Sequence, residues 1–107
     1  MSEIIHITDA DFEEVVYKNP LPVFVDFWAP WCGPCRMLAP KLEAAAAAFD
    51  GRAVIAKYDV DVSSGKAAEF GVRGIPTIIA FKEGRAVDQR TGACDQATLD
   101  AFIEKNL

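Results

Sequence analysis

The sequence predicts an α/β fold in which a central mixed β-sheet of about five strands is flanked by about four helices. Segments rich in β-branched and aromatic residues alternate along the chain with segments whose apolar residues recur at helical spacing. Glycine and proline fall between these segments. Near the end of the chain, two strand-like segments are separated only by the turn Glu83-Gly84, which favours antiparallel pairing and makes the sheet mixed.

The first half of the chain predicts two strands, each followed by a helix. A short apolar segment at residues 4–7 precedes a helix that begins at Thr8. Residues 23–29 have the β-branched and aromatic content of a strand buried on both faces. Apolar residues then recur at helical spacing over 35–49, and Pro40 inside this pattern should remove one backbone hydrogen bond and kink the helix.

The second half predicts three strands and two helices. Residues 53–60 form a strand and residues 63–72 a short helix, which Gly71 ends. Residues 77–90 form the two strands around the Glu83-Gly84 turn, and residues 95–106 form the last helix. Strands separated by a helix are expected to pair parallel through right-handed crossovers, and the last two to pair antiparallel.

Size and composition limit the classes of protein. The chain has 107 residues, 51% hydrophobic and 25% charged, so we expect residues 1–107 to form a single domain with its own apolar core. The formal net charge of −5, without a basic cluster, disfavours nucleic acid as a partner. No apolar run approaches the ~20 residues of a membrane span, and residues 1–12 lack a secretory signal, so we expect a cytoplasmic protein.

The segment WCGPC lies at 31–35, where the strand 23–29 passes into a helix. In α/β sheets, reactive sites gather at such junctions. Residues three apart on a helix lie about 5–6 Å from one another, so Cys32 and Cys35 can be either bonded or free. Helix N–H groups favour the thiolate of Cys32. We expect Cys32 to be exposed and to attack a substrate disulfide, and the more buried Cys35 to resolve the mixed disulfide.

Two charged residues interrupt apolar strands. Burial should raise the pKa of Asp26 and prepare it to accept a proton from Cys35 near neutral pH. The alternative is an aspartate that faces solvent at a sheet edge, which would not explain its apolar neighbours. Lys57, on the strand 53–60, is the expected partner of Asp26, although its stem could instead follow the sheet and reach water.

Several motifs together resemble the thioredoxin family. VDFWAPWCGPC, Lys57, GIPT at 74–77, the turn at 82–84 and TGA at 91–93 occur in the family's order and cover the whole chain. The resemblance implies the thioredoxin fold and a monomeric protein-disulfide reductase with a redox-active Cys32/Cys35 pair and no bound cofactor. It also implies re-reduction by thioredoxin reductase, usually with electrons from NADPH.

The resemblance further implies a substrate-binding surface. It implies that the Ile75-Pro76 peptide is cis, beside the cysteines, and that the backbone of Ile75 pairs with an extended substrate segment. Trp28 would pack beneath the site. The residues that would meet protein substrates are Trp31, Gly33, Pro34, Ile75, Pro76, Gly92 and Ala93.

Cys94 departs from the family pattern, because an apolar residue is more usual there. As a small hydrophobe it can pack on Leu99 ahead of the last helix. The alternative is a regulatory thiol that dimerises or is glutathionylated under oxidation.

Two other functions remain possible on the sequence alone. A structural zinc site needs four ligands, and beyond the CxxC pair the chain offers only Cys94 and His6. A binding module would use the apolar rim around Trp31 to hold a partner without turnover.

Overall fold

The computed structural model describes residues 4–107 and confirms the predicted order of elements. It contains five strands and four helical segments. In chain order they are β1 (Ile5–Ile7), η1 (Glu13–Tyr17), β2 (Val23–Trp28), α1 (Gly33–Ala48), β3 (Val54–Asp59), α2 (Gly65–Glu69), β4 (Thr77–Lys82), β5 (Arg85–Thr91) and α3 (Gln96–Lys105).

The strands form one sheet in the order β1-β3-β2-β4-β5. β3 pairs parallel with β1 and with β2, and β4 and β5 pair antiparallel as predicted. The prediction that all strands separated by a helix pair parallel was wrong for β4, which runs antiparallel to β2. The helix α2 has five residues, roughly 7.5 Å, and does not run the length of a six-residue strand, about 20 Å. The chain therefore enters β4 at the end of the sheet where it leaves β3, and both Tyr58 and Thr77 pair with Phe27.

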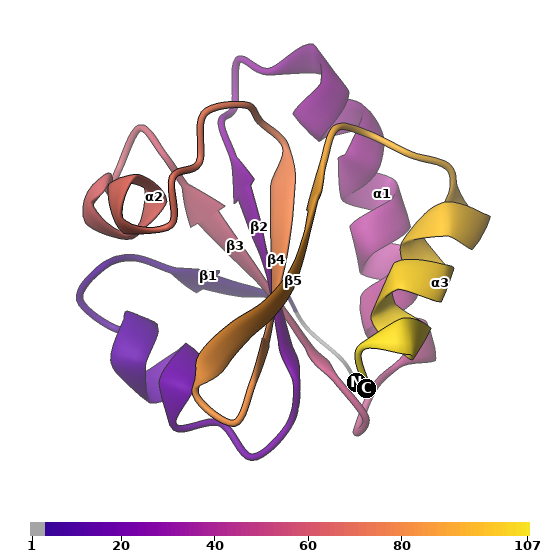
Figure 1. Ribbon diagram of the computed structural model, residues 1–107. Coiled ribbons are helices and arrows are strands. Elements are labelled where there is room, and N and C mark those ends of the chain that lie inside the picture. Colours follow the sequence, from indigo (N-terminus) through magenta and orange to yellow (C-terminus); the bar gives the residue numbers. More distant parts are fainter. Residues whose placement is uncertain (1–3) are drawn as a thin grey trace.

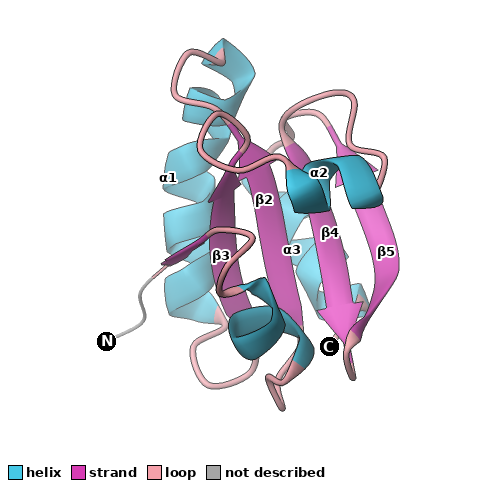
Figure 2. Ribbon diagram, turned by 90° about the vertical axis from the view of Figure 1, so that its left-hand side faces the viewer, coloured by secondary structure: helices cyan, strands magenta, loops and turns pink. Residues whose placement is uncertain are grey.

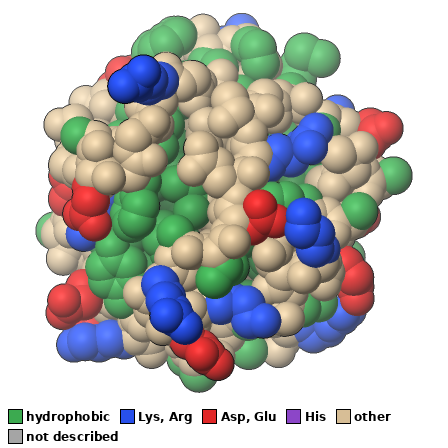
Figure 3. Space-filling view, in the orientation of Figure 1, with side chains coloured by type: hydrophobic (Ala, Val, Ile, Leu, Met, Phe, Trp, Pro, Cys, Tyr) green, Lys and Arg blue, Asp and Glu red, His purple; other side chains and the backbone are tan. Residues whose placement is uncertain are grey.

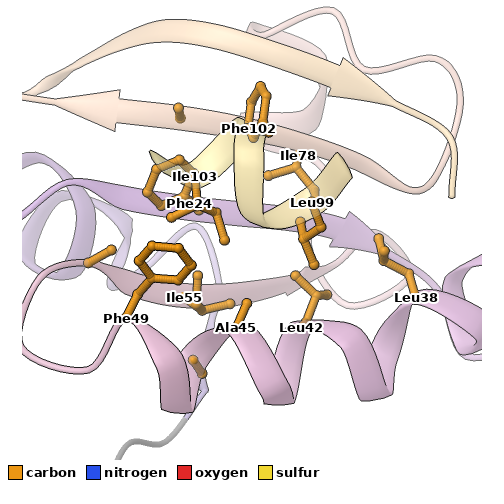
Figure 4. Close-up of a cluster of buried hydrophobic side chains, with 13 residues drawn as sticks. Phe24, Leu38, Leu42, Ala45, Phe49, Ile55, Ile78, Leu99, Phe102 and Ile103 are labelled. Atoms are coloured by element: carbon orange, nitrogen blue, oxygen red, sulfur yellow. The ribbon is translucent and has the colours of Figure 1, made fainter. Parts of the chain in front are cut away.

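Helices cover both faces of the sheet. Figure 1 shows α1 and α3 on one side of the strands, with η1 and α2 on the other, and Figure 2 shows the same layers from the side. The larger core cluster fills the space between the sheet and the pair α1 and α3 (Figure 4). In it, Phe24 and Ile55 from neighbouring strands meet Leu42 and Ala45 from α1 and Leu99 from α3. Within the five alanines at 44–48, Ala45 and Ala46 are buried and the others exposed, so one face of this part of α1 packs close to the sheet.

The first helical segment begins later than predicted. The Asp11 carboxylate accepts a hydrogen bond of 2.7 Å from the Thr8 backbone N–H, which holds the chain in a turn, and η1 starts only at Glu13 and is of π type. Nothing in the structure explains the π geometry. α1, in contrast, continues through Pro40 from Gly33 to Ala48.

The surface carries charges of both signs. In the orientation of Figure 1, lysine and arginine side chains lie interspersed with aspartate and glutamate (Figure 3). No helix within residues 4–107 is long and apolar enough to cross a membrane.

Candidate functional site

Cys32 and Cys35 form a disulfide at the start of α1, with their Cα atoms 5.2 Å apart. Cys32 is the N-cap residue, and its sulfur accepts a hydrogen bond of 3.2 Å from the backbone N–H of Cys35. Pro34 in the first turn has no N–H to offer. The same N–H would stabilise a thiolate on Cys32 once the disulfide is reduced, because it lies at the positive end of the helix dipole.

The expectation that Cys32 is exposed was wrong. The residue is 5% exposed and Cys35 is 1% exposed, and both pack with Ala29 in a small apolar cluster. Trp28 at the end of β2 and Ile75 in the loop before β4 pack against this cluster. Trp28 therefore lies against the cysteines, as the family resemblance implied.

The loop before β4 reaches the disulfide because β4 is antiparallel. Thr77, its first residue, pairs with Phe27 near the end of β2. The preceding Ile75-Pro76 peptide is cis, which confirms the expectation, and the Ile75 carbonyl oxygen lies 3.8 Å from the Cys32 sulfur. The Gly92 N–H donates a 2.8 Å hydrogen bond to the Pro76 carbonyl. The segment at Gly92 is thus tied to the cis-peptide segment, which in turn lies against Cys32.

An exposed apolar side chain, that of Trp31, directly precedes Cys32 in the chain. Trp31 is 66% exposed, and its indole N–H donates a hydrogen bond of 2.9 Å to a carboxylate oxygen of Asp61. Asp61 was not predicted from the sequence to belong to the site. Its position just after β3 was an available signal, since polar residues that follow parallel strands gather at this end of the sheet. Gly33 is half-buried, whereas Pro34 and Ala93 are exposed.

Asp26 lies inside the protein without a polar partner. It is 0% exposed, and neither carboxylate oxygen has a hydrogen-bond partner within residues 4–107. Burial raises the pKa of Asp26 to about 7, and the positive charge of Lys57 opposes that increase. The predicted desolvation of this carboxyl group is confirmed.

Lys57 pairs in register with Asp26 across β2 and β3. The side chains of a paired row lie on one face of the sheet. The ammonium group lies 4.0 Å from the centre of the Trp28 ring, and the residue is 9% exposed. Lys57 thus acts on Asp26 through its charge, because Asp26 accepts no hydrogen bond.

The third cysteine lies outside this arrangement. Cys94 is free and half-buried, and it packs against the core cluster that contains Leu99. Its backbone carbonyl accepts a hydrogen bond of 2.8 Å from the Lys41 ammonium group. Within residues 4–107, no group of three or more His, Cys, Asp and Glu side chains could hold a metal ion.

Comparison with known proteins agrees with this geometry. The family model described as Thioredoxin matches residues 3–105. Thioredoxin from Haemophilus influenzae is 47% identical over 107 residues, and thioredoxin from Synechocystis sp. is 43% identical over 107 residues, in each case over 100% of both chains. Thioredoxin from Porphyra purpurea is 46% identical over 92% of both chains. With a bonded CxxC pair at the start of α1, the chain belongs to the thioredoxin family of protein-disulfide oxidoreductases.

Proposed function

We propose that this protein reduces disulfide bonds in protein substrates through a reversible dithiol–disulfide cycle of Cys32 and Cys35. The observation that carries the proposal is the position of the Cys32 sulfur. It accepts the Cys35 N–H at the start of α1 and lies beside the cis peptide before β4. A sulfur held in this way is stabilised as a thiolate and has a substrate-binding backbone next to it.

The cycle has two exchange steps. The Cys32 thiolate attacks one sulfur of the substrate disulfide, forms a mixed disulfide and releases the other substrate sulfur as a thiolate. Cys35 then loses its proton and attacks the Cys32 sulfur. The Cys32–Cys35 bond forms, the mixed disulfide breaks, and the substrate leaves with both sulfurs reduced. The pair of electrons gained by the substrate comes from the two cysteines.

Asp26 is the proposed acceptor of the Cys35 proton. Its pKa of about 7 makes the carboxyl group half-ionised near neutral pH, which suits a group that takes up and releases one proton per cycle. Lys57 is the proposed positioning residue, since its charge limits how far burial raises that pKa. Without this charge, Asp26 would hold its proton at higher pH.

The proposed substrate face is the surface around the Cys32 sulfur. An extended segment of the substrate would pair with the Ile75 backbone, next to the cis peptide. The exposed Trp31 ring would supply apolar contact, and its hydrogen bond to Asp61 fixes the orientation of the ring. The residues of the substrate face are Trp31, Gly33, Pro34, Ile75, Pro76, Gly92 and Ala93, with Trp28 as a support beneath them.

Re-reduction is proposed to come from thioredoxin reductase, with NADPH as the electron source. This follows from membership of the thioredoxin family, in which the dithiol is regenerated by a separate reductase. We also propose that the protein acts in the cytoplasm as a single-domain monomer. Cys94 is proposed to be a packing residue, since it lies against the core.

The experiment that tests this function is a redox equilibrium of the Cys32/Cys35 pair in graded glutathione buffers, read by mass spectrometry so that Cys94 is followed separately. A midpoint near −270 mV, for which thioredoxin is itself the standard example, is expected of a reductase. A midpoint near −120 mV would mean that the protein oxidises its partners. Full biological activity of a Cys32→Ser, Cys35→Ser double variant would favour a binding module, and stoichiometric zinc would favour a metal site.

A further inference from the structure

A pocket of about 210 Å³ lies at the β1 edge of the sheet, and no residue of the proposed substrate face lines it. Its wall includes His6 from β1, Trp28 from β2 and Lys57 from β3. One water molecule occupies about 30 Å³ of liquid, so the pocket has room for a molecule with several non-hydrogen atoms. The pocket is therefore a candidate binding site separate from the cysteines.

One wall of the pocket carries a buried ammonium group. Lys57 is 9% exposed, and its ammonium nitrogen lies 4.0 Å from the centre of the Trp28 ring. The ion pairs within residues 4–107 do not include Lys57. Asp26, its partner in register on β2, accepts no hydrogen bond. A buried charge is costly without an opposite charge in contact, so Lys57 favours a negatively charged ligand in the pocket.

The indole N–H of Trp28 is a second unpaired donor at this pocket. It is buried and has no hydrogen-bond partner within residues 4–107, whereas the indole N–H of Trp31 donates to Asp61. Buried polar groups are normally paired with protein or with another molecule. An ammonium group and an indole N–H can only donate hydrogen bonds. Lys57 and Trp28 therefore both require a hydrogen-bond acceptor.

The other lining residues limit the charge and the size of the ligand. Asp59 lies two residues beyond Lys57 on β3, about 7 Å along the strand. A negative group in contact with the Lys57 ammonium is closer to that positive charge than to Asp59, whereas a second negative charge on the ligand would be repelled. Ile7 and Val62 add apolar surface to the wall. These features fit a ligand with one negative charge and a short apolar part.

We propose that this pocket binds a short-chain monocarboxylate, whose carboxylate accepts hydrogen bonds from the Lys57 ammonium group and the Trp28 indole N–H. The apolar end of the ligand contacts Ile7 and Val62, and Val62 lies at the mouth because it is 68% exposed. The site goes beyond the proposed disulfide reduction and does not depend on it, since neither Cys32 nor Cys35 lines the pocket.

Binding should depend on pH, because an ionised Asp26 opposes a second negative charge beside Lys57. Burial raises the pKa of Asp26 to about 7, so this carboxyl group loses most of its charge by pH 6. The other groups around Asp26 are Lys57 and Asp59 on β3, His6 on β1, the apolar Ile78 on β4, and Cys35 on α1, which does not titrate in the disulfide. The imidazole of His6 gains positive charge in the same range. We therefore expect tighter binding at pH 6 than at pH 8.

The test is a titration of the oxidised protein with sodium propionate at constant ionic strength, read by NMR through the two indole N–H signals. We expect the Trp28 signal to shift saturably at pH 6, with a Kd of about 1 to 10 mM. The Trp31 signal is the internal control and should not move, because that N–H is bonded to Asp61. Propionamide has a similar shape but no charge and should bind at least about tenfold more weakly.

Two variants locate the site, each with a matched control. Lys57→Met should raise the Kd for propionate at least about tenfold, because the charged donor is lost. Lys105→Met, at an exposed position on α3, should leave the Kd unchanged. Val62→Asp places a negative charge at the mouth of the pocket without disturbing the core, and should raise the Kd about threefold. Val87→Asp, at a position 48% exposed on β5, should have no effect.

A third variant tests the link to Asp26. Asp26→Asn should bind propionate at pH 8 at least about threefold more tightly than the wild type, because the opposing charge is gone. The absence of a saturable Trp28 shift up to about 100 mM propionate would overturn the proposal, and so would equal Kd values for propionate and propionamide. Unchanged binding in both Lys57→Met and Val62→Asp would overturn it as well. None of these measurements reads disulfide reduction, so failure of the proposed function would leave their outcome intact.

Discussion

Two aspartates of this protein have opposite surroundings. Asp26 is fully buried on β2 and accepts no hydrogen bond, whereas the exposed Asp9, just after β1, accepts three. Its donors are the Tyr58 hydroxyl at 2.7 Å and the backbone N–H groups of Gly65 at 2.9 Å and Lys66 at 3.0 Å. Burial raises the pKa of Asp26 to about 7, while the hydrogen bond from Tyr58, followed by that from Lys66, lowers the pKa of Asp9.

The difference separates a reactive group from a structural one. The hydrogen bonds to the Asp9 carboxylate also fix the start of α2 against β3. The negative charge of Asp9 therefore stabilises the fold. Asp26 receives no such compensation, and its negative charge destabilises the folded protein. Asp26 lies next to Lys57 and close to the cysteines in the chain. A destabilising carboxyl group in such a position is suited to accept and release a proton.

The largest expected effect comes from removing the sulfur that Asp26 is proposed to serve. Cys32→Ser should reduce the rate of protein-disulfide reduction at least about a thousandfold, because the covalent step loses its nucleophile. The rate is measured as thiol release from a disulfide-bonded protein. Cys94→Ser is the matched control and should retain the wild-type rate. A Cys32→Ser variant with more than a tenth of wild-type activity would contradict the proposed cycle.

The next effect is on stability, through Asp26. Between pH 3.8, the usual value for aspartate, and about 7, the unfolded chain releases this proton while the folded protein keeps it. Stability therefore falls across this range and levels off above it. At about 1.4 kcal/mol per pH unit, the total loss is roughly 4 kcal/mol. Asp26→Asn should remove this pH dependence, measured by urea unfolding at pH 5 and pH 8.

Asp50→Asn, at an exposed position after α1, is the control for this measurement and should keep the wild-type pH dependence. The Asp26→Asn variant should also reduce protein disulfides about a hundredfold more slowly at pH 7, if proton removal from Cys35 limits the rate. If the free energy of unfolding changed equally with pH in the wild type and in Asp26→Asn, burial would not control the pKa of this carboxyl group.

Asp9 should respond to pH in the opposite direction. Because its pKa is lowered in the folded protein, the stability it contributes is present above pH 3.8 and is lost as the pH falls through the folded value. Asp9→Asn should lower Tm by roughly 5 °C at pH 7. The difference in Tm between Asp9→Asn and the wild type should be smaller at pH 3 than at pH 7. Calorimetry at both pH values checks this, and a constant difference would mean that the charge of Asp9 is not what holds α2.

The smallest effect is expected when Asp9 loses one donor. Tyr58→Phe keeps the buried ring, which packs against Phe27 with centroids 4.8 Å apart, and removes only the hydroxyl. Tm should fall by roughly 2 to 4 °C at pH 7, less than in Asp9→Asn, because the donors from α2 remain. A larger fall in Tm than in Asp9→Asn would mean that the Tyr58 hydroxyl contributes more to stability than the charge of Asp9 does.

Much of the site could be predicted from the sequence. The pair Cys32 and Cys35 follows from helical spacing and from its place at the end of a strand. The raised pKa of Asp26 follows from a carboxylate inside an apolar strand, because local composition already indicates burial there. The last helix was predicted from residue 95 onward, and Asp95 is its N-cap, which accepts the Thr98 N–H at 2.8 Å.

Other features depend on distances that local sequence does not encode. The burial of Cys32 results from contact with Ile75, which lies 43 residues away. Asp61 belongs to the site only because the fold brings the loop after β3 beside Trp31. Each of these two contacts joins segments that are not paired by backbone hydrogen bonds within the sheet. The pairing preferences of the separate strands therefore could not reveal them.

The sequence by itself determined the order of helices and strands, the apolar residues that form the core, and which two thiols can form a bond, because these depend on spacing within one segment. Only the tertiary structure decided that β4 runs antiparallel to β2 and so brings the cis peptide to the Cys32 sulfur. It also placed His6, Lys57 and Asp26 in one row. The physical reason is that strand direction and register minimise free energy over the whole sheet, where short connections and shared core packing act together.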